Sequence, residues 1–509
     1  IELMKTLVVI ILIFLFIQTN NWLNDNKANG VHAEQHRQQN NSTYWKQRVK
    51  SMFDFSFDNY MKHAFPKDEL KPISCEGFTT WGNYSLTLID SLDTLAIMGR
   101  WEDFVKGVQY VTNHIHFDKN ISVSLFETNI RILGGLLSNH LIIENHRIVI
   151  KGEEMDMKNE SKKLLELAID LGNRLIPAFD TPTGLPYGAI NLKHGIAEDE
   201  SRITCAAAVG TYLIEFGVLS ALTKNDTYIN IIRNAAYKLY TYRNKRTGLL
   251  GNHINIETGA WTHQSATIGA GVDSYFEYLL KGYKLFGRRD YYTMFMELYE
   301  NIMKYQYRKP WYYDVNMMNG DQVWPLYNSL QGFWPGIQSM MGEVDKAKET
   351  VEAFHSVWRR YGAVPEGYNI VHGKVQDHQE GYPLRPELIE SLYHLYQTTG
   401  DPLYRQIGQD IINSLELYTK TKCGHANIKN VMTMEKEDKM ESFFLSETLK
   451  YLYLLYDDDS WVHKTPHVFN TEGHVFPLDF YGSQHHLKPW KLLNNHIEPS
   501  CSITQKHDF

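Results

Sequence analysis

Two pairs of carboxylates lie inside strongly apolar stretches of this sequence. Glu387 and Glu390 follow Pro386, a residue type that suits the first position of a helix. Asp90 and Asp93 repeat the same i, i+3 spacing, which places both acids of a pair on one helix face. Burying an unpaired carboxylate costs several kcal/mol. Acids in such segments therefore predict a shared polar cavity, a bound cation, or both.

Two further acids have a plainer explanation beside the functional one. Glu127 is followed one helical turn later by Arg131, and the two could form an ordinary ion pair on one face. Asp273 lies near the start of an expected helix, where its charge could simply stabilise the helix N-terminus. Taken alone, neither acid decides between structure and function.

Two weaker signals occur late in the chain. Glu441 opens an apolar segment, where it would serve equally well as a charge at a helix start. Thr471 and Glu472 lie in a stretch without helical periodicity. A threonine offers hydroxyl and carbonyl oxygens, the kind of ligand that calcium prefers, but a single Thr-Glu pair is a weak signal for calcium.

Helices are expected to position these acids. Apolar residues at i, i+3, i+4 spacing predict inner helices over residues 86–98, 126–137, 204–222, 271–285, 328–341, 385–396 and 441–456. More charged, amphipathic segments lie between them, such as residues 160–175, 226–242 and 345–361. The alternation predicts an all-α domain of helical hairpins around one axis. A helical solenoid would also alternate apolar and amphipathic helices, but its acids should lie on exposed faces.

The bulk composition is that of a globular protein, with 43% apolar and 22% charged residues. Lysine and arginine number 51 against 59 aspartate and glutamate, which gives a net charge of −8. No dense basic block occurs. The electrostatic footprint of a nucleic-acid-binding protein is therefore missing.

The first residues predict entry into the secretory pathway. An apolar run over residues 7–17 follows Lys5 and has the length of a signal-peptide core. It is shorter than the roughly 20 residues of a membrane-spanning helix, so an uncleaved N-terminal anchor is the only membrane contact we expect. Sequons for N-glycosylation support this compartment; they begin at Asn40, Asn41, Asn83, Asn120, Asn159 and Asn225.

The four cysteines exclude a disulfide-dense scaffold. Cys75 and Cys423 both lie in turn-like surroundings, and in an oxidising compartment we expect them to be bonded to each other. Cys205 lies in a stretch of small residues and is expected to be a buried thiol, while Cys501 is near the C-terminus. No Cys/His spacing indicates zinc.

Read together, the motifs resemble glycoside hydrolase family 47, the class I α1,2-mannosidases, over about residues 50–477. The matching segments are residues 91–95, 127–138, 273–275, 384–387, 441–449 and 470–472. The resemblance implies an (α/α)7 barrel with a calcium ion at its base. It also implies inverting removal of α1,2-linked mannose from N-glycans.

The resemblance assigns roles to individual residues. Glu127 and Asp273 match the acid-side carboxylates, without deciding which of them protonates the leaving oxygen, and Glu387 matches the base that activates water. Thr471 matches the direct calcium ligand, with Glu472 acting through water. The groups that match positions around the sugar are Arg131, Glu390, Glu441 and Asp93. An acid and a base on opposite sides of the anomeric carbon are what an inverting glycosidase needs.

Residues 52–61 and 63–70 are most similar to one branch of the family, the endoplasmic-reticulum degradation-enhancing α-mannosidase-like proteins. That branch implies trimming of high-mannose N-glycans on misfolded glycoproteins in the lumen of the endoplasmic reticulum, with resident oxidoreductases or chaperones as further partners. A non-catalytic receptor for the same glycans is the alternative. Retention of Glu127, Asp273 and Glu387 favours turnover, because a lectin needs no acid or base.

We expect three regions along the chain. Residues 1–45 form a signal peptide or signal anchor with a polar lead-in, residues 46–480 form the catalytic barrel, and residues 481–509 form a short tail. In such a barrel, Glu127, Asp273, Glu387 and Thr471 should converge in one cavity although they span more than 300 residues of chain.

Overall fold

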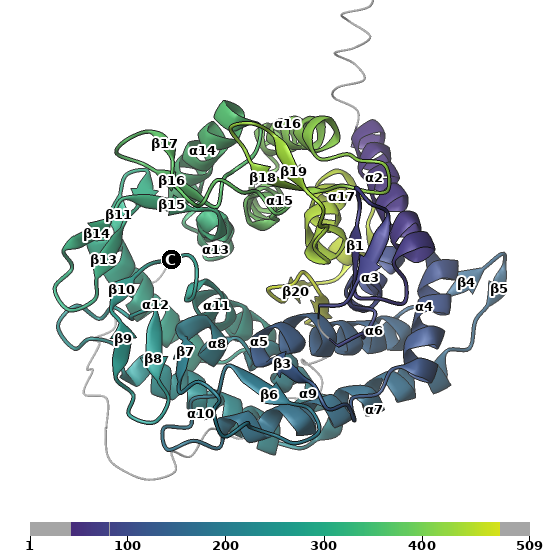
Figure 1. The fold of residues 1–509 in the computed structure, drawn as a ribbon, viewed down its shortest axis with the longest axis horizontal. Helices are drawn as coiled ribbons and strands as arrows, with labels where there is room; N and C mark the ends of the chain where they lie inside the picture. Colours follow the sequence, from purple (N-terminus) through teal and green to yellow (C-terminus); the bar gives the residue numbers. More distant parts are fainter. Residues whose placement is uncertain (1–41, 81, 479–509) are drawn as a thin grey trace, which may run out of the picture.

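The structure, a computed structural model, describes residues 42–80 and 82–478. Its helices form two concentric rings around one axis (Figure 1). The inner helices are α3 (Leu86–Ile97), α6 (Gly134–Asn145), α9 (Leu213–Thr223), α11 (Asp273–Phe286), α13 (Trp334–Met340), α15 (Glu387–Thr399) and α17 (Leu449–Tyr456). The outer helices are α2 (Ser42–His63), α4 (Trp101–His114), α7 (Lys158–Leu175), α10 (Thr227–Thr241), α12 (Arg289–Tyr305), α14 (Val344–Tyr361) and α16 (Pro402–Tyr418).

Each inner helix packs against the outer helix that follows it in the chain, from α3 with α4 to α15 with α16. The remaining pair closes the ring, because α17, the last α-helix described, packs against α2, the first. The expected all-α ring of helical hairpins is therefore confirmed. The predicted signal segment and Cys501 lie outside the described residues.

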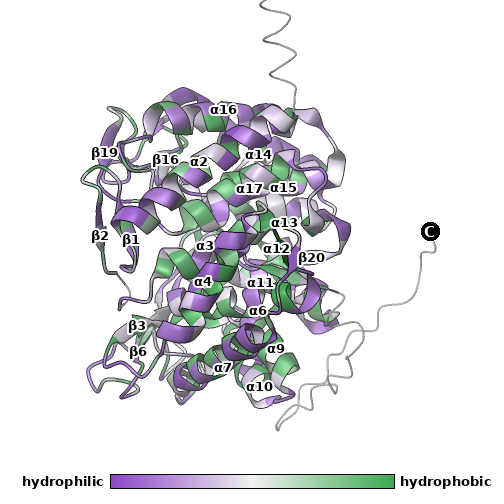
Figure 2. Ribbon diagram, turned by 90° about the vertical axis from the view of Figure 1, so that its right-hand side faces the viewer, coloured by the Kyte–Doolittle hydropathy of each residue, from purple (hydrophilic) through white to green (hydrophobic). Residues whose placement is uncertain are grey.

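Burial explains which helices are inner and which are outer. Every residue of α3 is buried, including its polar ones, whereas α4 buries only one stripe, formed by Phe104, Val105, Gly107, Val108 and Val111. Such a stripe is the signature of a helix with one solvated face. Figure 2 shows the same contrast between the apolar α17 and the hydrophilic residues along α2. Among the described residues, Ala206–Thr223 has the composition of a membrane span but is 83% buried within the barrel.

Short helical segments precede several inner helices. They are α5 (Leu125–Glu127), α8 (Ala206–Gly210), the π-helices η1 (Thr128–Leu133) and η4 (Phe444–Thr448), and the 3₁₀ segment η3 (Ser329–Phe333). Two more 3₁₀ segments, η2 (Ile176–Phe179) and η5 (Trp461–Lys464), follow α7 and α17. The predicted helix over residues 126–137 is thus interrupted by a π turn, and the one over residues 204–222 begins as a strand.

The strands are two to four residues long and form small antiparallel sheets. Those of the first half of the chain are β1 (Glu69–Lys71), β2 (Glu76–Phe78), β3 (Ser122–Ser124), β4 (Val149–Ile150), β5 (Glu153–Glu154), β6 (Ala189–Asn191), β7 (Ile203–Cys205), β8 (His253–Asn255), β9 (Trp261–His263) and β10 (Ser265–Ala266). The later ones are β11 (Tyr307–Arg308), β12 (Trp311–Tyr312), β13 (Asp314–Asn316), β14 (Gln322–Trp324), β15 (Leu326–Asn328), β16 (Gly367–Asn369), β17 (Lys374–Val375), β18 (Asn427–Asn430), β19 (Glu435–Glu437), β20 (His467–Phe469) and β21 (Val475–Pro477).

The sheets give the two ends of the barrel different characters. Strands β1, β2, β3, β6 and β19 lie at one end, and β20 lies toward the other (Figure 2). The pairing of β20 with β21 runs from His467 opposite Pro477 to Phe469 opposite Val475. The turn of this hairpin carries the predicted calcium residues Thr471 and Glu472.

The predicted disulfide is present. Cys75 and Cys423 are bonded, with 5.5 Å between their Cα atoms and 348 residues between them in the chain. Cys75 lies between β1 and β2, and Cys423 follows α16. The bond therefore ties the first part of the barrel to its last part.

Candidate active site

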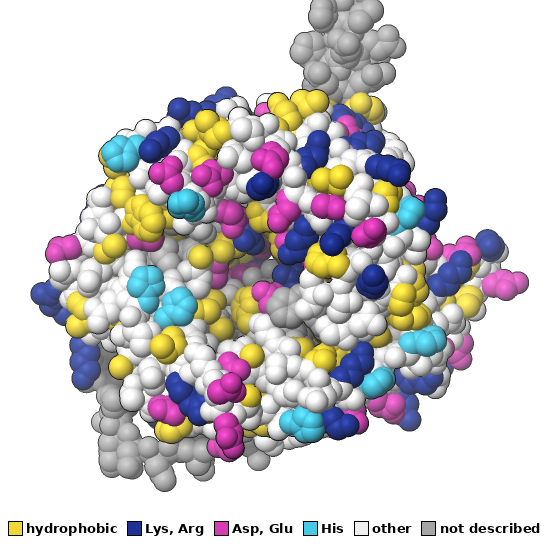
Figure 3. All heavy atoms as spheres, in the orientation of Figure 1, with side chains coloured by type: hydrophobic (Ala, Val, Ile, Leu, Met, Phe, Trp, Pro, Cys, Tyr) yellow, Lys and Arg dark blue, Asp and Glu magenta, His cyan; other side chains and the backbone are white. Residues whose placement is uncertain are grey.

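A cavity of about 410 Å³ lies at the centre of the barrel, and Figure 3 shows a hollow there at the end that carries β1, β2, β3, β6 and β19. Its lining includes all four of the residues expected to converge, Glu127, Asp273, Glu387 and Thr471. Arg131, Glu390 and Glu472 line it as well. Asp93 and Glu441, which the resemblance placed around the sugar, are not part of this lining.

Unusual backbone conformations lead the chain into two of the site helices. Gly271 has a φ of +86°, and an oxygen of Asn252 lies 2.5 Å from where its Cβ would be, so a larger residue would not fit. Asp273 follows as the first residue of α11. Leu384, ahead of α15, has a φ of +61°, a strained state that surrounding structure must hold. Thr448 does so by donating a hydrogen bond of 2.6 Å to the Leu384 carbonyl.

Both π-helices carry a charged side chain of the site. Arg131 lies in η1 and Glu447 lies in η4, and both line the cavity. A π turn shifts the phase of the residues around it, and such turns occur frequently at functional sites. The π turns therefore aim side chains that a regular α-helix would place elsewhere.

Arg131 joins several acids at one side of the cavity. Its Nε donates to Glu127 Oε2 at 2.8 Å, so the predicted ion pair exists. Its Nη1 donates to Glu472 Oε1 at 2.5 Å and lies 3.6 Å from Asp90 Oδ2. The structural and functional explanations of Glu127 are thus compatible, because the pair with Arg131 holds Glu127 at the cavity wall.

Glu387 has a carboxyl group with unused hydrogen-bonding capacity, on a side chain that is 15% exposed. Burial raises its pKa to about 8, although Arg385 acts in the opposite direction. Its Oε1 lies 3.8 Å from Arg385 Nη1, while Oε2 has no hydrogen-bond partner among the described residues. Burial likewise raises the pKa of Asp273 to about 6, although the hydrogen bond from the Ser274 amide lowers it. Both acids thus have proton affinities raised by their apolar surroundings.

The raised pKa of Glu387 predicts a stability effect. Between the ordinary value near 4.5 and about 8, the unfolded carboxyl group loses its proton before the folded one, so the wild type loses stability as pH rises through this range. Glu387→Gln has no such loss. The comparison is made in the presence of a chelator, so that no metal ion contributes. The free energy of unfolding of Glu387→Gln should exceed that of the wild type by about 1–3 kcal/mol at pH 8, and the two values should agree below about pH 4. Urea unfolding at several pH values tests this; a gap that does not change with pH would contradict it.

A hydrogen-bonded scaffold holds the turn that carries Thr471. The amide of Thr471 donates to Tyr278 Oη at 3.4 Å, and that hydroxyl donates to Glu215 Oε1 at 2.6 Å. Asn470 donates to the same Glu215 oxygen at 2.8 Å and to the Ile130 carbonyl at 3.0 Å. The turn is thereby fixed against α9, α11 and η1, and Thr471 projects into the cavity.

Asp93 and Glu441 have other partners. The fully buried side chain of Asp93 accepts hydrogen bonds from Lys450 at 2.9 Å and lies 3.2 Å from His474 Nδ1. Glu441 pairs with Lys439 at 2.7 Å. The i, i+3 acids Asp90 and Asp93 thus belong to an ionic network behind the cavity wall.

The sequence did not indicate four ionisable residues of the lining as site residues: Arg385, Glu277, Glu447 and Cys205. Glu277 and Glu447 could have been found by the pattern that indicated the predicted acids, since each is an acid inside a strongly apolar helical segment. Arg385 stands two residues before Glu387 and donates twice to Glu366, at 2.8 and 2.9 Å. Cys205 is unbonded and half-buried at the cavity rather than buried, because it ends β7 instead of lying within a helix.

The donor atoms around Thr471 suit a hard cation. The nearby acids Glu277, Glu390, Glu447 and Glu472 offer only oxygen, which is the ligand set of calcium. Burial raises the pKa of Glu447 well above its usual range, and the charges of Glu387 and Glu390 add to this. Among the described residues, no three acid, histidine or cysteine side chains form a metal-binding cluster by themselves.

Comparison with known proteins identifies the family. The model of glycosyl hydrolase family 47 matches residues 52–478. The chain belongs to glycosyl hydrolase family 47. It is 48% identical to alpha-mannosidase I MNS4 of Arabidopsis thaliana over 439 residues, which cover 85% of this chain and 69% of that protein. It is 43% identical to the human ER degradation-enhancing alpha-mannosidase-like protein 2 over 455 residues, which cover 86% of this chain and 78% of that protein.

The fold also agrees with a solved structure of the family. The alpha-1,2-mannosidase from Trichoderma reesei superposes with a TM-score of 0.78 at 25% identity, covering 86% of this chain and 99% of that one. The family 47 fold is an (α/α)7 barrel, as the sequence motifs implied. The mouse relative, 43% identical over 455 residues, is likewise named ER degradation-enhancing alpha-mannosidase-like protein 2.

Proposed function

We propose that this family 47 protein is an inverting α1,2-mannosidase that trims high-mannose N-glycans of misfolded glycoproteins in the lumen of the endoplasmic reticulum. The observation that carries the proposal is Glu387, whose carboxyl group at the cavity has one buried oxygen, Oε2, without a hydrogen-bond partner among the described residues. A receptor without turnover would gain nothing from this arrangement, because burying such a group costs stability.

In the proposed reaction, Glu387 accepts a proton from a water molecule whose oxygen bonds to the anomeric carbon of mannose. Glu127 or Asp273, on the acid side, delivers a proton to the glycosidic oxygen as its bond to that carbon breaks. Attack from the face opposite the leaving group inverts the configuration, and one water is consumed per mannose released. Without a cation, the pKa of Glu387, about 8, lies above that of Asp273, about 6, so Glu387 can act as the base only when positive charge at the cavity, from Arg385 and a bound cation, keeps it ionised.

The other charged residues of the cavity position these groups. Arg131 holds Glu127 and Glu472, and Arg385 holds Glu366 while facing Glu387. Thr471, with Glu472 acting through water, would hold calcium. When bound, calcium would supply positive charge that orients sugar hydroxyls and water.

Two features support the compartment and the class of substrate. The Cys75–Cys423 bond is typical of an oxidising compartment. The asparagines of the four sequons within the described part of the chain, Asn83, Asn120, Asn159 and Asn225, are all exposed. The relatives named for ER degradation favour misfolded glycoproteins as substrates and resident oxidoreductases or chaperones as partners.

Incubation of the purified protein with a high-mannose N-glycan, followed by mass analysis, tests the proposal. With calcium, we expect successive losses of single hexoses, and with excess chelator we expect release to fall by at least about tenfold, since mutating or removing parts of a metal site typically costs 10–100-fold. The same chelator should lower the midpoint of thermal unfolding, because a cation that binds only the folded state stabilises it. Equal release with calcium and with chelator would exclude the metal from the proposal.

A non-catalytic receptor is the second candidate, and the carboxylate-rich cavity would suit glycan binding as well. The two functions separate in the same assay. Glycan binding without any hexose loss, in calcium and with candidate oxidoreductases added, would favour the receptor.

A further inference from the structure

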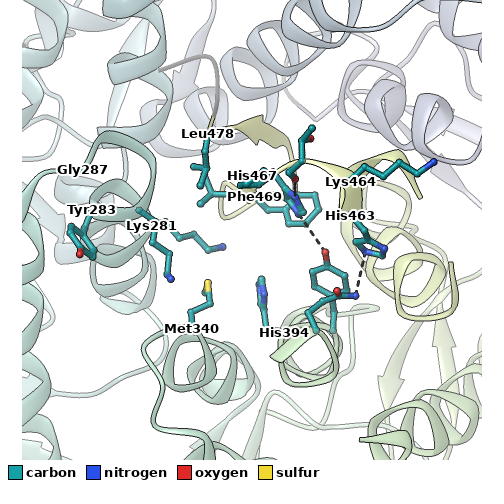
Figure 4. A pocket seen from close by; sticks show the side chains of 16 residues that line it. Lys281, Tyr283, Gly287, Met340, His394, His463, Lys464, His467, Phe469 and Leu478 are labelled. Carbon is teal, nitrogen blue, oxygen red and sulfur yellow. Dashed lines mark hydrogen bonds between the residues drawn. The ribbon is translucent and has the colours of Figure 1, made fainter. Parts of the chain in front are cut away.

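A second cavity, of about 790 Å³, lies where the inner helices end rather than where they begin. Its volume is within the usual range for small-molecule sites. It is lined by the last turns of α11 and α15, by η5 and β20, and by Leu478 (Figure 4). Along α11, Asp273 lines the active-site cavity and Lys284 lines this one, about 16 Å apart at 1.5 Å per residue. The two cavities therefore lie at opposite ends of the same helices.

The charge of the second cavity is opposite to that of the active site. Its lining contains no aspartate or glutamate among the described residues, and its ionisable groups other than tyrosine are Lys281, Lys284, Lys464, His394, His463 and His467. Lys281 is neutralised, because it bonds to Glu277 and to Glu390, the latter at 3.0 Å. Lys284, an exposed residue of the lining, forms no ion pair or hydrogen bond with any described residue.

Aromatic rings form another wall of this cavity. The rings of Tyr393 and His463 stack at 5.8 Å with an angle of 22°, and those of His467 and Phe469 are 4.8 Å apart. Figure 4 shows Lys281 and Tyr283 on one side, His463 and Phe469 on the other, and His394 between them. Tyr393 and Phe469 are themselves almost fully buried, so a flat or apolar group can contact only the half-buried rings of Tyr283, His463 and His467.

His394 adds an unused polar atom. Its Nε2 is buried and has no hydrogen-bond partner among the described residues; the nearest carboxylate oxygen, of Glu390, is 3.6 Å away. A buried nitrogen of this kind costs stability unless something binds it. Together with Lys284 it offers a donor to a ligand that enters the cavity.

We propose that this cavity is a second ligand site, for an organic anion that carries an aromatic or other flat ring. The anionic group would lie against Lys284 and His394, and the ring against Tyr283, His463 and His467. A cation would find no carboxylate among the described residues of the lining. The negative end of the α11 dipole offsets part of the lysine charge, so moderate affinity is expected.

A fluorescence titration of the full chain tests this site with two probes. One is 8-anilinonaphthalene-1-sulfonate, and the other is N-phenyl-1-naphthylamine, which has the same rings without the sulfonate. Lys284→Met should raise the Kd of the sulfonate by about fivefold, the factor expected from one ion pair at a partly solvated site. It should leave the Kd of the amine unchanged, and this unchanged value also shows that the variant is folded.

Two more variants locate the binding. Lys464→Met is the matched control, because Figure 4 shows Lys464 extending away from the cavity; it should change neither Kd by more than about twofold. Thr465→Trp, an exposed residue of the lining, should weaken both probes by filling the space. Glu387→Gln should alter neither, so a failure of the proposed mannosidase activity would leave this result intact.

Three outcomes would overturn the proposal. The first is an equal Kd of the sulfonate for the wild type and Lys284→Met. The second is a loss of affinity in Lys464→Met as large as that in Lys284→Met. The third is undiminished binding of both probes to Thr465→Trp, which would place the dye elsewhere on the molecule.

Discussion

Glu387→Gln should release mannose from a high-mannose N-glycan at least about 10²-fold more slowly than the wild type, because general base catalysis typically supplies about 10²–10⁴-fold. The amide keeps the size and shape of the carboxyl group but cannot take a proton from water. Since Glu387 Oε2 has no hydrogen-bond partner among the described residues, the change removes no described bond of that atom. Mass analysis of released hexose under single-turnover conditions measures the effect directly.

Asp314→Asn is the matched control for this variant. Asp314, in β13, is another acid whose pKa burial raises to about 6, but it does not line the active-site cavity. The same carboxyl-to-amide change there should leave mannose release within about twofold of the wild type. Undiminished release by Glu387→Gln would refute its role as the base, and an equal loss in Asp314→Asn would point to a general disturbance of folding.

Glu387→Gln also separates an enzyme from a receptor. In an enzyme, Glu387→Gln should still bind the glycan, because the surrounding carboxylates and Thr471 remain, and a substrate-trapping variant would result. In a receptor, neither binding nor any trace of hydrolysis should change. Isothermal titration with the glycan, run beside the release assay, gives both readings on one preparation.

Much of the site was predictable because burial of acids is costly and therefore rarely accidental. The sequence indicated the start of α15 and the face of it that meets the cavity, because Glu387 and Glu390 directly follow Pro386. Acids within apolar segments revealed Glu127 and Asp273 as candidates, and the structure brings both into the cavity. Thr471 depended on the family resemblance, because a turn between two short strands leaves no periodic signal.

The parts that could not be predicted depend on phase and on distant partners. Hydrophobic periodicity does not distinguish a π turn from an α turn, so the paths of η1 and η4 remained hidden. Glu447 lies in η4 and lines the cavity, whereas Glu441 precedes that π turn and pairs with Lys439. Asp93 shares the spacing of Glu387 and Glu390, yet its partners Lys450 and His474 lie 357 and 381 residues away. No local pattern reveals such partners.

Lys450→Met should lower the free energy of unfolding by about 3–5 kcal/mol, because it leaves the charge of Asp93 buried without its main partner. Both side chains are fully buried, and the Lys450 ammonium lies 2.9 Å from Asp93 Oδ1 and 2.6 Å from the Gly473 carbonyl. Urea unfolding at pH 7 measures the loss. The exposed pair of Lys429 and Glu435 supplies the matched control, since Lys429→Met should change stability very little.

The double variant Lys450→Met/Asp93→Asn separates the buried charge from the lost packing. Removing the charge of Asp93 should recover a large part of the loss, so the double variant should be more stable than Lys450→Met alone. Part of the loss should remain, because the Gly473 carbonyl, in the turn that carries Thr471, no longer accepts from Lys450. If the double variant loses more free energy of unfolding than the two single variants lose together, the ion pair is not the source of the effect.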